Sequence, residues 1–382
     1  MKIALIGQKG IPAKQGGIER HVEELSIRLA DAGLNVSVYS RPHYSGNKLK
    51  YKNVNLINLP SLNTKHLDAI THTFISSIHA LFQDYDVIHY HGVGPSLLSW
   101  IPRVFKPRTK VVATFHCLDR KHQKWNSFAR LMLSLGERSA CLFPHQTISV
   151  SKTLKKYCEY RFDKKTTYIP NGFSVNTEVS NTSILSKHNL KKDNYILVAS
   201  RLVKHKGIHT LIEAYNKIST NKKLVIAGEG ANTIDYVNEI RQMARKNKNI
   251  IFVGEQTGGN LKALFENAYL FVQPSEAEGL SIALLESMSY NLPLLASDIE
   301  ENMEVINGVA LKFKNKDVND LAKKLKQAVD NPAYIKNKAM LAKKSVDKNY
   351  NWDNITKETI NLYKQPFYSP AIAKLKISKI TR

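Results

Sequence analysis

The stretch Ser275-Glu-Ala-Glu-Gly-Leu-Ser-Ile-Ala-Leu-Leu-Glu-Ser-Met288 decides how the whole chain is interpreted, because it joins a strand pattern to a helix pattern. An apolar run typical of a strand, 268–274, comes just before it, and apolar residues at helical spacing fill its second half. Glu278 therefore falls at a strand-to-helix junction, and Glu286 about two turns into the helix. This pattern predicts one strand–turn–helix unit of a parallel sheet.

The chemistry of this stretch suits a sugar nucleotide. Free backbone amides at the start of a helix attract anions such as phosphate. Carboxylates such as Glu278 and Glu286 accept hydrogen bonds from sugar hydroxyls. The competing interpretation is two solvated glutamates on a surface helix, and it would win for an isolated pair at this spacing. The surrounding sequence decides between the two.

Short apolar runs alternate with amphipathic stretches along nearly the whole chain. Expected strands in the first half are 2–7, 36–41, 54–59, 86–91, 110–116 and 146–150, with helices notably at 18–32 and 126–140. Expected strands in the second half are 195–200, 223–228, 249–254, 268–274 and 293–297. Such alternation predicts parallel sheets covered by helices on both faces.

The length of 382 residues predicts two domains. We place their boundary at Ile169-Pro-Asn-Gly172, because residues 174–194 are polar and basic with weak periodicity, as in a linker. Ligands of open parallel sheets bind beyond the carboxyl ends of the strands, so two such domains would form a cleft. The predicted fold class is α/β, with two doubly wound, Rossmann-like domains facing across that cleft.

The composition narrows the class of protein. The net charge of +24, from 56 basic and 32 acidic side chains, implies an anionic partner. No zinc-finger or aromatic RNA-binding motif appears, which argues against nucleic acid. No apolar run has the length of a membrane span, and the start is too short for a signal peptide, so we expect a cytoplasmic protein. Its three cysteines lack metal or redox spacing and fit small buried side chains.

Two loops carry residues suited to a diphosphate. Gly16 and Gly17 precede an amphipathic helix, where the backbone can approach a ligand and the helix N-terminus favours an anion. Their spacing is not that of a dinucleotide fold, and a plain turn explains them equally well. Arg201 and Lys206 follow the first strand of the second half, where two cations can clamp a diphosphate leaving group. The alternative is ordinary solvated charge.

A histidine at the end of a first-half strand, His116, is a third candidate group. In a cleft it could donate a hydrogen bond to a sugar hydroxyl or a phosphate. A satisfied structural histidine is the equal alternative. His89 and His91 end the neighbouring strand and are weaker candidates.

Taken together, these segments resemble the GT-B-fold glycosyltransferases of family 4, which are retaining enzymes. The resemblance runs from Met1 to about Tyr363, and its ordered set of pieces is specific although each piece alone is ordinary. The pieces are Gly16-Gly17, Thr114-Phe-His116, Ile169-Pro-Asn-Gly172, Ser200-Arg201 with Lys206-Gly207, Ala227-Gly-Glu-Gly230, and Glu278 to Glu286.

The first half is also similar to the rhamnosyltransferase-like enzymes of bacterial surface-polysaccharide assembly. The motifs are Gly10-Ile-Pro12 with Gly16-Gly-Ile-Glu19, His89-Tyr-His-Gly-Val-Gly-Pro95, and Leu118-Asp119 with Lys124-Trp125. Cys117 departs from this subgroup, which usually has glycine there, and the change could alter the fit of an acceptor.

The resemblance implies a division of labour along the chain. Residues 1–172 would be the acceptor-side domain and 173–348 the domain that binds the nucleotide sugar. A helix at 349–365 would pack back on the first domain, and 366–382 would be a basic tail. The Gly16-Gly17 loop would close over the diphosphate from the first domain, and His116 would lie near the sugar being transferred.

The resemblance also assigns roles within the second domain. Glu286 would hold the nucleotide ribose, and Glu278 would face the donor sugar. Backbone amides of Gly279, Leu280 and Ser281 would meet the sugar and phosphate. Arg201 and Lys206 would grip the diphosphate.

The expected function is transfer of one hexosyl unit, with retention, from a nucleotide-diphosphate sugar to a sugar or lipid-linked saccharide. No cofactor and no metal is expected, because two cations and helix termini would neutralise the diphosphate. The alternatives are a nucleotide-sugar epimerase or a phosphorylase on the same fold, and a non-catalytic basic protein that binds membrane or nucleic acid.

Tryptophan and cations cluster in the first half in a way that suits an anionic membrane surface. The residues are Trp100, Arg103, Lys106, Arg108 and Lys110, then Arg120, Lys121, Lys124 and Trp125. The alternative is that the cations are solvated and the tryptophans lie in the core. We expect peripheral binding to the inner face of the cell membrane.

Overall fold

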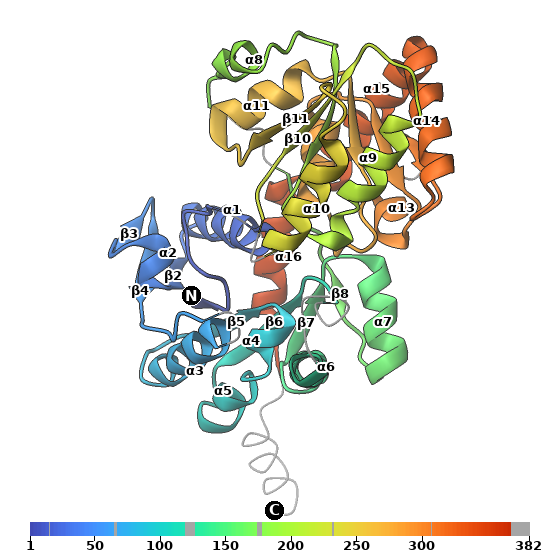
Figure 1. The fold of residues 1–382 in the computed structure, drawn as a ribbon. Coiled ribbons are helices and arrows are strands. Elements are labelled where there is room, and N and C mark those ends of the chain that lie inside the picture. Colours follow the sequence, from blue (N-terminus) through green and yellow to red (C-terminus); the bar gives the residue numbers. More distant parts are fainter. Residues whose placement is uncertain are drawn as a thin grey trace, which may run out of the picture. The chain divides into compact units, whose positions relative to one another are not determined.

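The computed structural model describes residues 1–14, 16–64, 67–118, 127–173, 178–230, 233–306 and 308–367 (Figure 1). The chain forms two compact units. The N-terminal unit comprises Met1–Gly172 and Trp352–Arg382, and the C-terminal unit comprises Phe173–Asn351. The expected linker at 174–194 and the basic tail at 366–382 lie partly outside the described residues, which leave out 174–177 and 368–382.

The N-terminal unit is built on an eight-stranded sheet in the order β3-β4-β2-β1-β5-β6-β7-β8. Its strands are β1 (Lys2–Ile6), β2 (Asn35–Ser40), β3 (Lys50–Tyr51), β4 (Val54–Asn58), β5 (Val87–His91), β6 (Lys110–Phe115), β7 (Gln146–Ser149) and β8 (Thr167–Tyr168). All neighbours pair in parallel except β3 with β4. Strands β5 and β6 are buried along their whole length, which explains why they read as near-continuous apolar runs.

Helices cover both faces of this sheet. They are α1 (Gly17–Asp31), α2 (Pro42–Ser45), α3 (Asp68–Leu81), α4 (Val93–Ser96), α5 (Trp100–Phe105), α6 (Ser127–Leu142), α7 (Lys152–Phe162) and α16 (Trp352–Lys364). The crossover from β1 to β2 runs toward one edge of the sheet, and the crossovers from β4 onward run toward the other. Right-handed connections therefore place α1 on one face and α3, α5 and α6 on the other. The contacts agree, because α1 packs on α16, whereas α3 packs on α4 and α5, and α4 packs on α6.

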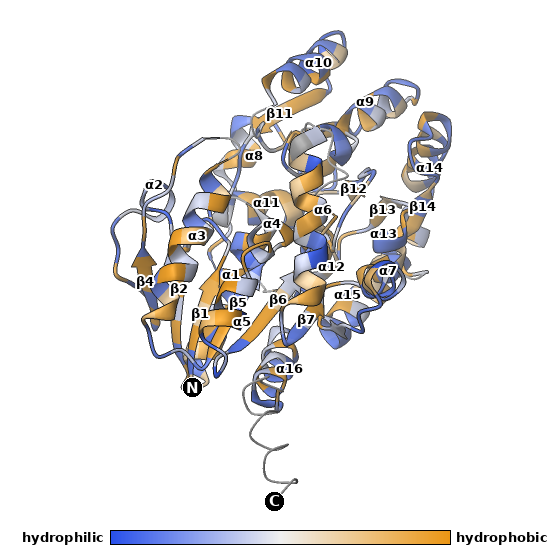
Figure 2. Cartoon of the chain, turned by 90° about the horizontal axis from the view of Figure 1, so that it is seen from below, coloured by the Kyte–Doolittle hydropathy of each residue, from blue (hydrophilic) through white to orange (hydrophobic). Residues whose placement is uncertain are grey.

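The core of the N-terminal unit joins α1, the strands and the returning helix α16. It contains Val22 and Leu25 of α1, Ile3 and Leu5 of β1, and Trp352, among others, all nearly or fully buried. In Figure 2 strands such as β1, β2 and β4 appear orange, as expected for strands that are buried between two helix layers. Helix α16 begins at Trp352, immediately after the chain leaves the C-terminal unit.

The C-terminal unit has a six-stranded, all-parallel sheet in the order β11-β10-β9-β12-β13-β14. Its strands are β9 (Tyr195–Ala199), β10 (Lys223–Ala227), β11 (Ile250–Gly254), β12 (Leu270–Gln273), β13 (Leu294–Ser297) and β14 (Leu311–Phe313). Its helices are α8 (Ser183–Lys187), η2 (Lys204–Lys206), α9 (Ile208–Asn216), α10 (Ile234–Ala244), α11 (Gly258–Asn267), α12 (Ile282–Ser289), α13 (Glu300–Ile306), α14 (Val318–Asp330) and α15 (Pro332–Asn349). The predicted α/β class with two doubly wound units is confirmed.

Three local predictions need correction. From residue 178 onward the expected linker is folded, because it contains α8, buries Ile184 and Leu190, and packs on α11. Strands β3, β8 and β14 were not predicted, since runs of two or three residues show no periodicity. Glu286 lies just over one turn into α12, not two, because that helix begins at Ile282.

Candidate functional site

The edge of the C-terminal sheet brings the predicted donor residues together. Strands β9 and β12 are neighbours, with Ile196 opposite Leu270, so the loops that follow their carboxyl ends lie at the same edge. The first of these loops carries Arg201 and Lys206, and the second carries Glu278. This edge is where open parallel sheets bind ligands.

Lys206 and Glu278 form a direct ion pair at this edge. The Lys206 Nζ lies 2.5 Å from Glu278 Oε1, and Gln273 Nε2 donates to the same oxygen at 2.7 Å. The Glu278 side chain is only 9% exposed, so a cation and an amide hold its charge in place of water. The sequence placed these two residues at the ends of separate strands, and the structure brings them into contact.

Close approach of the two backbones fixes the geometry of that pair. Gly207 has φ +68°, and a Cβ at this position would come within 2.0 Å of the carbonyl oxygen of Pro274. The amide of Glu276 donates to the carbonyl of His205 at 2.8 Å, which ties the loops again. Only glycine fits this contact, and Lys206 immediately before it is thereby aimed at the second loop.

The start of helix α12 holds the remaining residues that were predicted to bind the nucleotide sugar. Ser281 caps the helix, and its Oγ accepts from the Leu284 amide at 3.3 Å. Gly279 and Leu280 are buried just before the cap, and Glu286 is half-buried on the helix. Arg201 is exposed. A helix start, one exposed cation and the Lys206–Glu278 pair thus share one edge of this unit.

The β1–α1 loop of the N-terminal unit is pinned by a glutamate that the sequence analysis did not single out. Gly16 has φ +99°, and a Cβ there would come within 2.1 Å of Glu19 Oε2. The amide of Lys9 donates to Glu19 Oε1 at 3.2 Å. Gly17 starts α1 directly after. The loop therefore folds back over the first turn of its own helix, which only glycine at position 16 allows.

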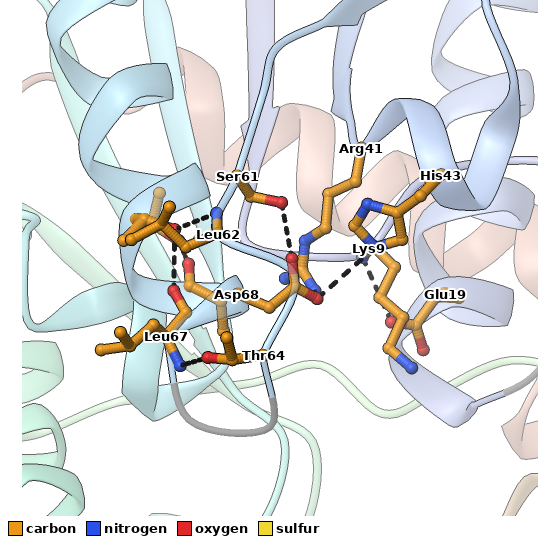
Figure 3. Close-up of polar contacts among 12 residues, drawn as sticks. Lys9, Glu19, Arg41, His43, Ser61, Leu62, Thr64, Leu67 and Asp68 are labelled. Atoms are coloured by element: carbon orange, nitrogen blue, oxygen red, sulfur yellow. Dashed lines mark hydrogen bonds and ion pairs between the residues drawn. The ribbon is translucent and has the colours of Figure 1, made fainter.

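A second polar network lies beside that loop, as Figure 3 shows. Arg41 follows β2 and pairs with Asp68 at 2.5 Å, and Ser61 Oγ donates to the other carboxylate oxygen at 2.6 Å. The amide of Arg41 donates to the carbonyl of Lys9 at 2.8 Å. Arg41 is buried. Through its contacts with Lys9 and Asp68, it connects the carboxyl ends of β1 and β2 to the start of α3.

His116 lies in a cluster of buried histidines at the end of β6. Its Nε2 is 3.2 Å from Nδ1 of His91, which ends the adjacent strand β5, and its ring meets that of His21 on α1 edge to face. Burial lowers the pKa of His91 and of His116 well below the ordinary value, and that of His21 to about 4. All three rings are therefore neutral near pH 7. His89 is a structural histidine, with Tyr363 Oη and Thr114 Oγ1 each at 2.7 Å.

Only part of the predicted membrane-binding cluster is exposed to solvent. Trp100 and Arg108 are exposed, whereas Arg103 contacts His145 and Lys106 donates to the carbonyls of Leu81 and Gln83. The prediction for Lys110 is wrong, since Lys110 is 1% exposed. Arg120, Lys121, Lys124 and Trp125 lie outside the described residues. Among the helices that the structure describes, none combines the length and apolarity needed to cross a bilayer.

Comparison with known proteins places this geometry in a family. A model described as glycosyl transferases group 1 matches residues 180–347, and one described as glycosyltransferase family 4 matches residues 15–177. An uncharacterized glycosyltransferase of Methanocaldococcus jannaschii is 30% identical, over 95% of this chain and 98% of its own. An O-antigen biosynthesis glycosyltransferase of Escherichia coli is 25% identical, over 66% of this chain and 72% of its own.

The fold comparison agrees. The crystal structure of Anabaena HepE in complex with UDP and glucose superposes with a TM-score of 0.78, covering 95% of this chain and 99% of that one, at 18% identity. Two Rossmann-like domains in tandem, with this likeness, define the GT-B class of glycosyltransferases. The chain belongs to the glycosyltransferases of group 1 and family 4, as its motifs predicted.

Proposed function

We propose that this glycosyltransferase moves one hexosyl unit, rhamnosyl by its subgroup motifs, from a nucleotide-diphosphate sugar to a sugar or lipid-linked saccharide. We place the reaction in cell-surface polysaccharide synthesis. The observation that carries the proposal is the Lys206–Glu278 pair beside Arg201 and the start of α12. The O-antigen glycosyltransferase relative and the fold neighbour that holds UDP and glucose support it.

In the C-terminal unit the proposed donor contacts follow from charge. Arg201 and Lys206 bind the diphosphate and stabilise the charge that it gains on leaving. Glu278 accepts a hydrogen bond from a hydroxyl of the donor sugar, and Glu286 accepts from the ribose. The amides of Gly279, Leu280 and Ser281 at the start of α12 contribute further donors to sugar and phosphate.

The N-terminal unit adds three proposed contacts. Gly16 and Gly17 place the backbone at the start of α1, where an anion is favoured, so we assign them to phosphate. His116 contacts the transferred sugar. We propose transfer with retention: the anomeric carbon–phosphate oxygen bond breaks, the bond to the acceptor oxygen forms on the same face, and the acceptor proton passes to the leaving diphosphate. The cations make a metal unnecessary for this step.

Peripheral membrane binding is part of the same proposal. Nine exposed apolar side chains lie on α3, α5 and α6 or at the end of α3, all in the helix layer on one face of the N-terminal sheet. They are Phe74, Ile78, Phe82, Trp100, Val104, Phe105, Leu131, Leu135 and Leu142. Exposed Arg108, Arg130 and Arg138 accompany them. An apolar layer with cations suits an anionic bilayer, where a lipid-linked acceptor would be met.

One experiment tests the reaction itself. The protein is incubated with a panel of nucleotide-diphosphate sugars and membrane saccharide-lipid, with and without a chelator. We expect free nucleoside diphosphate and an acceptor heavier by one hexosyl unit, with the donor's anomeric configuration by NMR, in both conditions. Conversion of the donor to an isomer without diphosphate release would indicate the epimerase instead. Loss of transfer in chelator would contradict the metal-free step.

A further inference from the structure

The histidine cluster of the N-terminal unit has the composition of a metal site. His21, His91 and His116 each offer a ring nitrogen, and these three atoms all lie within 4.8 Å of one another. The side chains are only 4%, 1% and 6% exposed. They come from three elements, α1, β5 and the end of β6, so folding of the sheet and its first helix assembles them.

The spacing of the cluster is close to that of a bound ion. Nδ1 of His91 and Nε2 of His116 are 3.2 Å apart and share a hydrogen bond, which a bound ion would replace. In a tetrahedral zinc site with Zn–N bonds of about 2.0–2.1 Å, two ligand nitrogens lie about 3.3 Å apart. The third nitrogen lies within 4.8 Å of these two, so an approach of at most about 1.5 Å would bring it to the same spacing.

An unpaired nitrogen atom gives a second indication. Within the described residues, Nε2 of His91 is buried without a hydrogen-bond partner, whereas Asn171 interacts with the His21 ring. Such atoms are rare in folded proteins, because burying a polar group without a partner is unfavourable. His89 shows the contrast, since both of its ring nitrogens are bonded.

The type of ligand fits the same conclusion. Histidine binds metal through its imidazole nitrogen. Imidazole suits zinc, copper, nickel and cobalt, whereas magnesium and calcium take oxygen ligands.

We propose that His21, His91 and His116 bind a divalent transition-metal ion, Zn²⁺ foremost, with a fourth position open to water or to a substrate oxygen. The proposed transfer step uses the cations of the C-terminal unit and no metal, so this site is not required for transfer. One consequence rests on the proposed function: an ion that takes the His116 imidazole withdraws it from the transferred sugar. Occupancy of the site therefore inhibits the enzyme.

Direct binding tests the site without reference to activity. Full-length protein without a polyhistidine tag is treated with chelator, dialysed, and titrated with Co²⁺ and then Zn²⁺. We expect the visible absorption of tetrahedral Co²⁺, its displacement by Zn²⁺, and one Zn²⁺ per chain by calorimetry. A wild-type protein that shows no such absorption and no stoichiometric Zn²⁺ binding overturns the proposal.

Variants assign the site to its residues. His21→Gln and His91→Gln should each weaken Zn²⁺ binding at least about tenfold, the effect seen on disturbing a metal shell. His43→Gln, which changes an exposed histidine of the same unit, should leave it unchanged. Circular dichroism checks that each variant folds, and the wild-type titration decides the matter if one does not. Equal binding by wild type and both ligand variants would assign the ion to surface histidines and overturn the site.

A transfer assay with and without Zn²⁺ tests the predicted inhibition. Zn²⁺ should lower transfer by wild type, and chelator should restore it. Zn²⁺ binding without inhibition would refute only the consequence for His116. Absence of transfer under every condition would refute the proposed function and leave the binding result standing.

Discussion

At the scale of single residues, the two cations proposed to bind the diphosphate, Arg201 and Lys206, differ in their contacts and exposure. Lys206 is held by Glu278, whereas Arg201 is exposed. We expect Arg201→Ala to lower kcat/KM by about two to three orders of magnitude, the usual effect of removing one group that stabilises a leaving charge. Because Arg201 is exposed, folding should not change. Rates with saturating and limiting donor provide the measurement.

Lys204 is the matched control for Arg201. It lies on η2, two residues before Lys206, and is also an exposed cation. Lys204→Ala should keep near-normal transfer. Equal losses in both variants would mean that the loop contributes general positive charge, and no specific diphosphate contact.

Glu286 and Glu278 are predicted to affect different steps, donor binding and sugar transfer. If it holds the ribose, Glu286→Gln should weaken binding of the nucleoside diphosphate by about tenfold, since a hydrogen bond to a charged group contributes about 1.5–3 kcal/mol. Glu278→Gln should instead slow transfer, because its proposed contact is with the sugar. Calorimetry with the nucleoside diphosphate distinguishes the two, with Glu239→Gln on the exposed side of α10 as control. Normal binding and normal transfer by both would remove these carboxylates from the site.

At the scale of elements, a buried lysine fastens the returning helix. Lys110 Nζ on β6 donates to the carbonyl of Tyr363 at 3.3 Å and of Gln365 at 2.9 Å, and also contacts the carbonyl of Leu362. A cation at a helix C-terminus also meets the negative end of the helix dipole. We therefore expect Lys110→Met to lower the free energy of unfolding of the N-terminal unit by about 2–3 kcal/mol.

Tryptophan fluorescence in urea measures this effect, because residues 173–351 contain no tryptophan and the signal reports the N-terminal unit. Arg108→Met, an exposed neighbour, serves as control and should change the midpoint little. Equal midpoints for Lys110→Met and wild type would contradict this prediction. They would show that hydrogen bonds from water to the three carbonyls stabilise the fold as well as those from the lysine.

A histidine on α3 predicts a dependence of stability on pH. Burial lowers the pKa of His72 to about 4, with nearby Arg41 acting in the same direction and Asp68 and the Ser40 backbone opposing. The unfolded chain takes up this proton near pH 6.5. Below that pH the unfolded state binds more protons, so stability falls as pH drops from about 6.5 to about 4.

Replacing this histidine should flatten the pH profile. His72→Gln should remove up to about 3 kcal/mol of the loss over that range, at about 1.4 kcal/mol per pKa unit. The buried His21 and His89 keep part of the slope in the variant. Urea midpoints at pH 8 and pH 5 measure the upper part of this range, where the difference should reach about 2 kcal/mol. Parallel profiles for the two proteins would show that His72 does not titrate with unfolding.

At the scale of the whole molecule, the sequence predicted elements better than contacts. Parallel strands buried on both faces, such as β5 and β6, show as apolar runs, so the two sheets followed from periodicity and length. The Lys206–Glu278 pair did not, because it depends on β12 lying next to β9. Lys110 was predicted to lie at a membrane surface, because the carbonyl groups that it binds lie about 250 residues further along the chain. No pattern near Lys110 in the sequence indicates them.

The apolar helix layer leads to a prediction for the complete protein. We expect salt-sensitive binding to anionic vesicles, because each cation near such a surface contributes about 1 kcal/mol and salt screens that attraction. Replacing Arg108, Arg130 and Arg138 with glutamine should weaken binding roughly fivefold per residue. Val104→Ser with Phe105→Ser should weaken it by removing apolar area from the bilayer.

The C-terminal unit offers a matched control for this layer. Met340 and Leu341 on α15 are each 50% exposed, comparable to Val104 at 61% and Phe105 at 65%. Met340→Ser with Leu341→Ser removes similar apolar area outside the proposed membrane face, so it should leave vesicle binding unchanged. Co-sedimentation with anionic and neutral vesicles at low and high salt distinguishes the cases. Equal binding to both vesicle types, or equal losses in the two double variants, would refute the membrane face and leave the transfer reaction untouched, since Arg201, Lys206 and Glu278 lie in the other unit.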